Sequence, residues 1–503
     1  MNNFNDEIWF VAPEMAPLVK AGGLGDVIGS LPKYLIKLGM NVKVVIPAYK
    51  FIDYGQFVQF EEDLPAGRVY FGDIPFDFGI SKAKTKDGIP LIFIKQDHFF
   101  GRDDVYGPHG GTVGYRDNLW RFSLLAHAAV HCMKILGIPK IVHSHDWSGG
   151  LVPAIIKQTF NESARPKIVF TVHNLGYQGV YPIDDLYDIG IDFKFNSSNA
   201  FEHFGTFNAL KGGLLLSDAV TTVSPSYAEE ITMPHRGFGL DGELRYLREN
   251  GKLSGILNGI DEEYWNPKDD GFLNVNFNGK KDRPYNFNDY DSWKNFKEEN
   301  KKALFSEIGL KFKKNSSGKQ LPVLGIVSRL TEEKGIDVFI DTLFNWNDFP
   351  FHVLILGTGK HFIEKKALYL QEFYKDKVYA KIGRFDEALA HKIYASSDIF
   401  IMPSRTEPCG LSQMISMRYG GVILAGDTGG LHDTVADLNR DSEYGNGIAV
   451  QHIDTHAISW ALDRLYNLYY EKNWGQFVIN SVNSDFSWNA SALKYIDLYN
   501  KIL

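Results

Sequence analysis

Two segments in the second half of the sequence carry the cations and glycines of a diphosphate-binding site. The segment SRLTEEKG, residues 328–335, places Arg329 and Lys334 five positions apart. An arginine fork and a lysine point charge on one turn can clamp two linked phosphates. In the segment DTGGL, residues 427–431, small residues let backbone N–H groups approach phosphate oxygens. The residues of that second turn are Thr428, Gly429 and Gly430.

A third segment, MPSRTEPCGL at residues 402–411, has the residue types needed to bind sugar hydroxyls. Glu407 lies directly before an expected helix start, where its carboxylate can accept hydrogen bonds from hydroxyl groups. The amides of the following turn can donate to the same hydroxyls. That turn consists of Cys409, Gly410 and Leu411.

The first half of the chain has its own glycine-rich turn, KAGGLGDV, at residues 20–27. Gly22 and Gly23 permit a tight turn between an expected strand and an expected helix, whose start favours an anion. Lys20 can reach a phosphate, and Asp26 can cap the helix. The spacing matches neither the dinucleotide-binding fingerprint nor the P-loop.

Histidines and an aspartate end two further apolar runs, in HSHDW at 143–147 and TVHNL at 171–175. His143 and His145 alternate onto one face of a strand, which allows a metal site or a cluster of hydrogen bonds at the strand end. No further His or Cys cluster stands nearby in sequence, so we favour polar groups that reach into a ligand cleft. Asp146 and His173 are the candidates.

The elements that must position these residues alternate between short apolar strands and helical patterns. Such continuous apolar strands predict parallel sheets covered on both faces, with ligands at the carboxyl ends of the strands. The predicted class is therefore α/β, with two doubly wound Rossmann-like domains facing across a cleft. A change to Asn-, Asp- and Lys-rich sequence marks the boundary. The predicted parts are residues 1–265, residues 266–485, and a helix at 486–503 that packs back onto the first domain.

Composition narrows the classes of partner. The 503 residues carry a net charge of −8 without a long basic run, which argues against nucleic acid and anionic membranes. Two cysteines, Cys132 and Cys409, make no disulfide framework. The apolar run at residues 8–12 is too short for a signal peptide, and no run approaches a membrane span. We expect a cytoplasmic protein; the sequence does not predict its oligomeric state.

Taken in order, these segments resemble bacterial glycogen synthases and the related plant starch synthases over nearly the whole chain. The motifs are KAGGLGDV, HSHDW, TVHNLGYQG, NGIDEEYWNP, SRLTEEKGID, MPSRTEPCGLSQ and TGGLHDTV. The resemblance implies the GT-B fold. It also implies transfer of glucose from ADP-glucose to the non-reducing 4-OH of an α-1,4-glucan such as glycogen, with retention of configuration and with no metal or other cofactor.

The resemblance also implies roles for individual residues. Glu407 binds hydroxyls of the transferred glucose, and Asn258 lies near that sugar. The donor phosphates are held by Lys20, Arg329 and Lys334, helped by Gly22, Gly23 and the Thr428–Gly430 turn. Asp146 and His173 line the glucosyl and acceptor side, and Phe385 stacks on the adenine. Retention is expected through attack from the face that the diphosphate leaves, with Glu407 as a nucleophile the alternative.

Some positions depart from the family pattern. Gly426 stands where arginine is usual, and Thr406 stands where phenylalanine is usual. These changes leave UDP-glucose open as an alternative donor. A catalytically silent relative that only binds glucan is the alternative from another class, although it would be expected to lose Lys20, Arg329 or Glu407. A phosphorylase is disfavoured because no pyridoxal-phosphate lysine signature is present.

Overall fold

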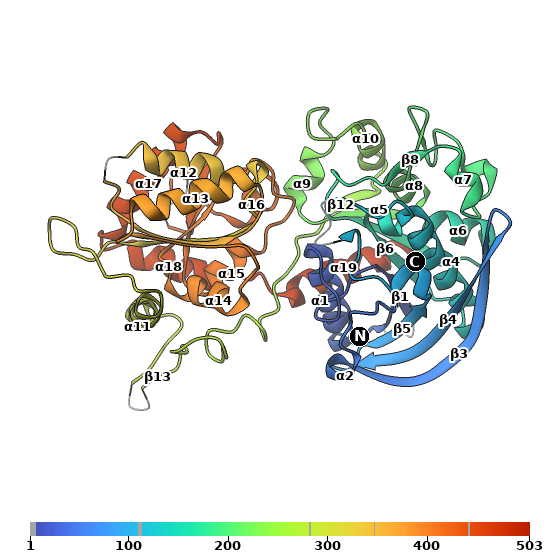
Figure 1. Cartoon of the computed structure of the whole chain (residues 1–503), viewed down its shortest axis with the longest axis horizontal. Coiled ribbons are helices and arrows are strands. Elements are labelled where there is room, and N and C mark those ends of the chain that lie inside the picture. The colour runs from blue at the N-terminus through green and yellow to red at the C-terminus, as the bar shows by residue number, and fades with distance from the viewer. Residues whose placement is uncertain (1–6, 109–112, 281–282, 347, 441–442) are drawn as a thin grey trace. The chain divides into compact units, whose positions relative to one another are not determined.

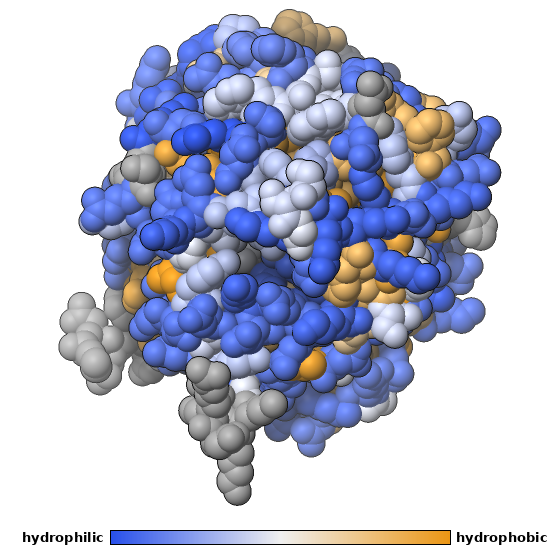
Figure 2. Space-filling model, turned by 90° about the vertical axis from the view of Figure 1, so that its left-hand side faces the viewer, coloured by the Kyte–Doolittle hydropathy of each residue, from blue (hydrophilic) through white to orange (hydrophobic). Residues whose placement is uncertain are grey.

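The computed structural model describes residues 7–108, 113–280, 283–346, 348–440 and 443–503, and the chain forms two compact units (Figure 1). Unit 1 comprises the chain up to Ile256 together with Trp488–Leu503, and unit 2 comprises Leu257–Ser487. The sequence places these boundaries after residues 265 and 485. Hydrophilic side chains predominate on the face shown in Figure 2, with apolar side chains in separate patches.

Unit 1 is built on a nine-stranded sheet in the order β12-β11-β7-β6-β1-β2-β5-β4-β3. Its strands from β12 to β5 are parallel, and the long β3–β4 hairpin closes one edge in antiparallel pairing. The bounds are β1 Glu7–Val11, β2 Asn41–Pro47, β3 Val58–Phe71, β4 Ile74–Thr85, β5 Pro90–Lys95, β6 Ile141–His145, β7 Lys167–Val172, β11 Ala219–Thr222 and β12 Leu253–Gly255.

Helices cover both faces of this sheet, so its central strands β1 and β6 are buried except at Glu7. On one face α4, α5, α6 and α8 contact one another, and on the other α1 packs against α19. A small sheet, β8-β10-β9, lies outside these layers. The bounds are α1 Gly23–Lys37, α2 Tyr54–Phe57, α3 Asp97–Phe100, α4 Asn118–Leu136, α5 Asp146–Gly149, α6 Val152–Thr159, α7 Asp185–Asp188, β8 Val180–Pro182, β9 Glu202–His203, β10 Thr206–Asn208, α8 Ala209–Leu216, α9 Pro225–Glu230, α10 Asp241–Glu249 and α19 Trp488–Ile502.

Unit 2 is built on a six-stranded parallel sheet in the order β17-β16-β15-β18-β19-β20. The strands are β15 Val323–Val327, β16 His352–Gly357, β17 Val378–Ile382, β18 Ile399–Met402, β19 Val422–Gly426 and β20 Gly447–Val450; a two-stranded ribbon pairs β13 Gly279–Lys280 with β14 Arg283–Pro284. Every residue of β15, β16, β18 and β19 is buried, as the unbroken apolar runs predict.

The helices of unit 2 also form two layers, so this unit is doubly wound as predicted. One layer contains α12, α13 and α17, and the other contains α11, α14, α15 and α18 (Figure 1). The bounds are α11 Tyr290–Ile308, α12 Ile336–Phe344, α13 His361–Phe373, α14 Glu387–Ser396, α15 Ser412–Arg418, α16 Gly429–Thr434, α17 Thr455–Tyr469 and α18 Trp474–Asn483. No helix among the described residues is both long enough and apolar enough to cross a bilayer.

The first helix differs from its prediction. The pattern predicts a helix over 27–38, with a kink or an effective start near Ser30 because of Pro32, but α1 begins at Gly23 and Pro32 lies inside it. The helix therefore starts within the glycine-rich segment itself. A proline here removes one intrahelical hydrogen bond, while α1 stays anchored by burial of its apolar face against β2 and α19.

The strand order of each unit defines where a ligand can bind. In unit 1 the chain leaves β1 toward β2 on one side and returns to β6 on the other. In unit 2 it leaves β15 toward β16 and returns to β18. Doubly wound sheets open a crevice at the carboxyl ends of the strands where the order switches in this way. The candidate segments 20–27, 143–147, 328–335 and 402–411 follow the strands that flank these two switch points.

Candidate active site

In unit 2 the two turns at the switch point are joined by an ion pair. Lys334, after β15, donates to both carboxylate oxygens of Glu407, after β18, at 2.8 and 2.7 Å. Ser404 Oγ donates to the same carboxylate at 2.8 Å. The Lys334 and Glu407 side chains are only 12% and 8% exposed. The structure thus brings together two charges that lie 73 residues apart in sequence.

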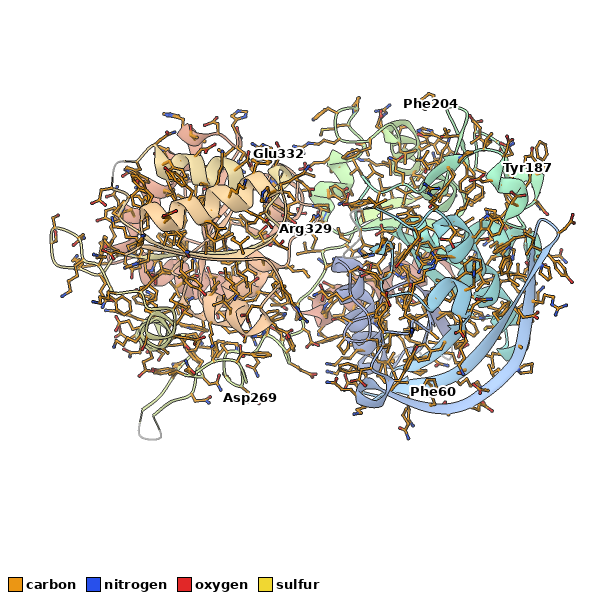
Figure 3. All side chains as sticks on the ribbon, in the orientation of Figure 1. Phe60, Tyr187, Phe204, Asp269, Arg329 and Glu332 are labelled. Atoms are coloured by element: carbon orange, nitrogen blue, oxygen red, sulfur yellow. The ribbon has the colours of Figure 1, made fainter. Side chains whose placement is uncertain are left out.

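Arg329 lies beyond the end of β15 and keeps its charge accessible (Figure 3). Its guanidinium approaches Glu333 only to 4.0 Å, and its side chain is 55% exposed. A loosely paired, solvated guanidinium can turn toward an incoming phosphate at little cost, because exposed ion pairs contribute little free energy. At this edge of the sheet Arg329 is therefore an exposed, loosely paired cation, and Lys334 is a buried cation paired with Glu407.

The glycine pair after β19 packs this site together. Gly429 has a positive φ of 48°, and a Cβ atom there would lie 2.1 Å from the Glu407 carbonyl oxygen. The Gly430 N–H donates to that same oxygen at 3.0 Å, and the Thr428 N–H donates to Gly426 at 3.0 Å. These two amides are engaged within the chain and are not offered to a phosphate in this structure. Close packing against Glu407 requires the glycines.

Asn258 and Cys409 meet beside Glu407. The Asn258 backbone donates a hydrogen bond to the Cys409 sulfur, yet burial raises the pKa of this thiol to about 12, so it stays protonated. Asn258 Oδ1 is buried and has no hydrogen-bond partner among the described residues. A buried acceptor without a partner is uncommon and marks a place for a ligand hydroxyl or a water molecule. Gly410 and Leu411 complete the turn before α15 and are half-buried.

Phe385 stands on the loop between β17 and α14, at the carboxyl edge of the same sheet. Its ring is 57% exposed, so a flat apolar face is open to a ligand.

In unit 1 the glycine-rich turn is held by an acid that sequence reasoning missed. Glu14 is 2% exposed. Its carboxylate accepts hydrogen bonds from Ala21 N at 2.6 Å, Gly22 N at 2.9 Å and Tyr106 Oη at 2.6 Å. The Gly22 amide is therefore already occupied, contrary to its predicted freedom to approach a phosphate. An acid three residues after a buried apolar strand was the signal that could have identified Glu14.

Lys20 and Asp26 flank that turn and form an ion pair at 2.7 Å. The Lys20 side chain is 54% exposed, whereas burial raises the pKa of Asp26 despite the opposing effect of Lys20. Gly22 and Gly23 leave open space where a Cβ atom would stand. The predicted helix-capping role of Asp26 is not observed, since Asp26 lies in the first turn of α1 and Gly22 occupies the N-cap position.

Asp146 and His173 meet at the ends of β6 and β7. Asp146 has a positive φ of 51°, a strained conformation for a non-glycine residue that is typical of functional sites. Its Oδ1 accepts the His173 N–H at 2.7 Å. Burial raises the pKa of Asp146 to about 7, although backbone N–H groups of His173 and Asn174 oppose the shift. This carboxyl group can therefore change charge near neutral pH.

Three histidines line up behind this carboxyl group. The rings of His143 and His145 stack with centroids 4.3 Å apart, and His145 Nδ1 lies 3.1 Å from His173 Nε2. His143 is hydrogen-bonded to Tyr499 Oη at 2.8 Å and to Thr171 Oγ1 at 2.6 Å. Burial lowers the pKa of His143 and His173 to about 3 and that of His145 well below its usual range. All three rings are neutral at physiological pH.

The hydrogen bond between His145 and His173 limits which of their ring nitrogens carry a hydrogen atom. His145 Nε2 and His173 Nδ1 both lack a partner among the described residues. If His145 donates from Nδ1, the unpaired N–H is on His173 Nδ1; if His173 donates instead, it is on His145 Nε2. Buried N–H groups without a partner are rarer than unpaired acceptors. Both nitrogens are buried, but the His173 residue is 9% exposed whereas His145 is fully buried, so the first arrangement is favoured and places the N–H on His173 Nδ1.

The described part of the chain contains no group of three or more His, Cys, Asp or Glu side chains placed to hold a metal ion. The alternative that His143 and His145 ligate a metal therefore has no geometric support in those residues. Three of their four ring nitrogens are used in hydrogen bonds to Tyr499, Thr171 and His173.

Comparison with known proteins identifies the family. The model of the starch synthase catalytic domain matches residues 7–246, and the model of group 1 glycosyl transferases matches residues 308–477. Glycogen synthase of Thermodesulfovibrio yellowstonii is 38% identical, with 98% of this chain and 97% of the relative covered. That of Streptococcus gordonii is 39% identical, with 99% and 100% covered. The catalytic domain of starch synthase IV from Arabidopsis thaliana, solved with bound ADP and acarbose, superimposes with a TM-score of 0.86 at 33% identity and 99% coverage of both chains.

The chain belongs to the glycogen synthase family. The family, the GT-B fold class and the glucosyltransferase activity of glycogen and starch synthesis that the sequence predicts are confirmed. A nucleotide-sugar donor and a glucan acceptor follow from this membership.

One departure from the glycogen synthase pattern has a structural reason. Gly426 ends β19, where a Cβ atom would lie 2.1 Å from the backbone oxygen of Ser404 and 3.1 Å from Ile453. This backbone excludes any side chain at position 426, so the arginine usual in the family has no room here. Of the cations that the family pattern predicts at this edge of unit 2, Arg329 and Lys334 are therefore the two present.

Proposed function

We propose that this member of the glycogen synthase family transfers glucose from ADP-glucose to the non-reducing 4-OH of an α-1,4-glucan, with retention of configuration and in the cytoplasm. The observation that carries the proposal is the Lys334–Glu407 pair at the switch point of unit 2, beside the exposed Arg329. The bound ADP in the Arabidopsis relative supports ADP as the nucleotide. The two free, buried thiols, Cys132 and Cys409, are consistent with a reducing compartment.

On the donor side, departure of the diphosphate leaves negative charge on its β-phosphate. Arg329 and Lys334 are proposed to stabilise this charge, and Lys20 to supply a third cation. Preorganised cations of this kind lower the barrier because they are in place before the charge develops. Lys334 can shift part of its interaction from Glu407 to the phosphate, which frees the Glu407 carboxylate to accept hydrogen bonds from glucose hydroxyls.

On the sugar side, the proposed contacts are directional hydrogen bonds. His173 Nδ1–H donates to a hydroxyl of glucose, and the unpaired Asn258 Oδ1 accepts from another. Asp146 lies beside His173 and accepts from the acceptor or the transferred sugar. The amides of Cys409, Gly410 and Leu411 form the remaining wall near the sugar, and Phe385 offers its exposed ring to the adenine.

Retention is proposed to proceed by attack on the face that the diphosphate leaves. Glu407 is the alternative nucleophile, but its carboxylate accepts from both Lys334 and Ser404, which disfavours attack on carbon. In the front-face route the departing phosphate accepts the proton of the acceptor 4-OH. The bond from C1 to the phosphate oxygen breaks as the bond from C1 to the acceptor oxygen forms.

The test compares ADP-glucose with UDP-glucose on glycogen, using the wild-type chain, Lys334→Ala and Glu407→Ala. We expect faster turnover with ADP-glucose and a loss of about 10²–10³ in rate for both variants, the typical effect of removing one charge-stabilising group. Lys366→Ala is the matched control, because Lys366 pairs with Asp341 in the same unit. Preference for UDP-glucose would replace the proposed donor, and wild-type rates in both variants would refute the site. Glycogen binding without any turnover would favour the silent relative.

A further inference from the structure

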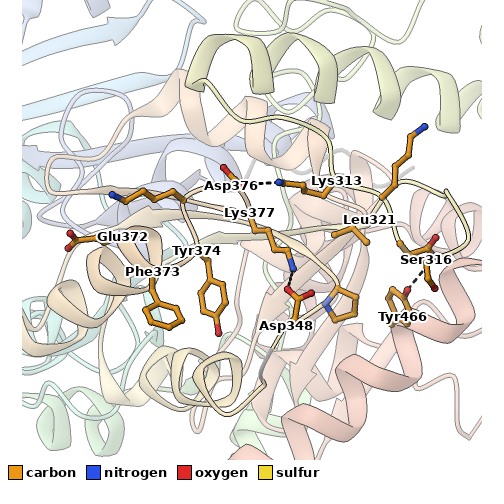
Figure 4. Close-up of a pocket in the computed structure, with 14 residues that line it drawn as sticks. Lys313, Ser316, Leu321, Asp348, Glu372, Phe373, Tyr374, Asp376, Lys377 and Tyr466 are labelled. Carbon is orange, nitrogen blue, oxygen red and sulfur yellow. Dashed lines mark hydrogen bonds and ion pairs between the residues drawn. The ribbon is translucent and has the colours of Figure 1, made fainter.

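A pocket of unit 2 lies at the edge of its sheet opposite to Arg329, Lys334 and Glu407. Its volume is about 730 Å³ (Figure 4). Leu321, Pro350 and Lys377, which line it, stand one or two residues before the first residues of β15, β16 and β17. At about 3.3 Å per residue, strands of this length separate the two edges by about 17–20 Å. We call it the amino-edge pocket.

Aromatic rings stand on opposite sides of the amino-edge pocket. Phe373 and Tyr374, at the end of α13, lie on one side, and Tyr466 of α17 lies on the other (Figure 4). Phe373 is 66% exposed and meets Tyr374 edge-on, with ring centroids 4.9 Å apart and planes at 71°. Phe344 also meets Phe373 edge-on, yet the exposed fraction leaves most of the Phe373 side chain accessible to a ligand. Exposed flat rings next to polar groups suit a ligand with apolar C–H faces and hydroxyl rims.

The charges of the pocket are mostly neutralised by one another. Lys313 pairs with Asp376 at 2.8 Å, and Lys377 pairs with Asp348 between the two aromatic sides (Figure 4). The remaining charged groups, Lys314, Glu372 and Lys375, are exposed to solvent and mixed in sign. A phosphorylated ligand would need a cluster of free cations. Paired charges instead offer donors and acceptors to the hydroxyl groups of a neutral ligand.

We propose that the amino-edge pocket binds an α-1,4-glucan chain, with a sugar ring stacked on Phe373 and sugar hydroxyls bonded to the Lys377–Asp348 pair. The proposal rests on the proposed function, because the ligand is the polymer that serves as acceptor. A branch held at this edge keeps other ends of the same polymer near the enzyme, which raises their effective concentration. The benefit exists for a large branched polymer and not for a short oligosaccharide.

The test uses the full chain with Phe373→Ala, and Trp460→Ala as the matched control. Trp460 is an exposed aromatic residue of α17 that does not line the pocket. We expect Phe373→Ala to raise the apparent KM for glycogen about three- to tenfold, as expected for one lost stacking contact, with unchanged kcat. The KM for maltotriose should stay unchanged, and Trp460→Ala should match the wild type in both assays.

Mobility in native gels containing glycogen gives a readout that does not need turnover. Glycogen should retard Phe373→Ala less than the wild type, and it should retard Trp460→Ala as much as the wild type. Thermal unfolding checks that both variants are folded. Equal retardation of Phe373→Ala and the wild type would overturn the inference, and so would an equal rise of KM for glycogen and maltotriose. An inactive wild type that still shows the predicted mobility difference would refute the proposed function and keep the pocket.

Discussion

The two sheets carry their candidate residues at corresponding positions, but the residue types differ. Each places its candidate residues on the turns that follow the two strands at its switch point. In unit 2 these turns carry a charge pair, Lys334 and Glu407, and a solvated cation, Arg329. In unit 1 the ends of β6 and β7 hold neutral rings and a carboxyl group whose pKa lies near 7, while the turn after β1 holds the Lys20–Asp26 ion pair.

The difference indicates what each half recognises. Charges that are already paired can exchange partners when a phosphate arrives, so unit 2 is suited to an anion. Neutral imidazoles cannot neutralise a phosphate, but they offer directional donors and acceptors, so the histidine region of unit 1 is suited to sugar hydroxyls. Glu14 strengthens this contrast, because it places a carboxylate beneath the very glycine turn that its sequence suggests for an anion.

The largest effect is expected when the Lys334–Glu407 ion pair of unit 2 is broken. Lys334→Met leaves the Glu407 carboxylate buried without its partner and should lower the free energy of unfolding by about 3 kcal/mol. The double variant Lys334→Met/Glu407→Gln removes both charges and should recover at least half of that loss without recovering turnover. Urea unfolding of the wild type, Lys334→Met, Glu407→Gln and the double variant measures this. Additive losses would show that the two side chains do not act as a pair.

Asp146→Asn tests the titrating group of unit 1. An unfolded aspartate has a pKa near ~3.9, whereas that of folded Asp146 is about 7. The folded chain therefore holds an extra proton between these values, and the contribution of Asp146 to stability falls as pH rises through this interval. The unfolding free energy of Asp146→Asn minus that of the wild type should therefore increase by about 2 kcal/mol from pH 5 to pH 8. A gain that is the same at both pH values would contradict the shifted pKa.

Glu14→Ala tests whether the glycine turn of unit 1 needs its buried acid. The variant removes the acceptor of two backbone amides and of Tyr106, so we expect about a tenfold loss of turnover as the turn loosens. Glu14→Gln, which keeps one acceptor oxygen, should lose less. Steady-state rates with ADP-glucose measure both, and equal rates for Glu14→Ala and the wild type would remove Glu14 from the site.

His145→Phe sharpens the proton assignment with a smaller effect. Without the hydrogen bond at His173 Nε2, the His173 ring is free to present an acceptor to the sugar, and kcat/KM should fall about fivefold. Because these rings stay neutral, the fall should be the same from pH 5.5 to pH 8. Tyr499→Phe, which removes the hydroxyl that is hydrogen-bonded to His143, should change kcat/KM less than twofold. A defect of His145→Phe that varies with pH would argue for a charged imidazole.

The sequence predicts the positions of the site turns well, because uninterrupted apolar runs mark the buried strands and polar residues follow directly after them. It also predicts that Asp146 and His173 share one site. It does not predict the partners that lie far along the chain, such as Tyr106 on Glu14 and Tyr499 on His143. Local spacing suggests free amides at Gly22 and Gly430, but tertiary contacts occupy both.

The placement of α19 has a consequence for biosynthesis. Trp488, Tyr495 and Tyr499 are buried in unit 1, yet they leave the ribosome after all of unit 2. Until translation of the second unit is complete, the nascent first unit therefore lacks the packing of α19 against α1, and His143 lacks its hydrogen bond to Tyr499.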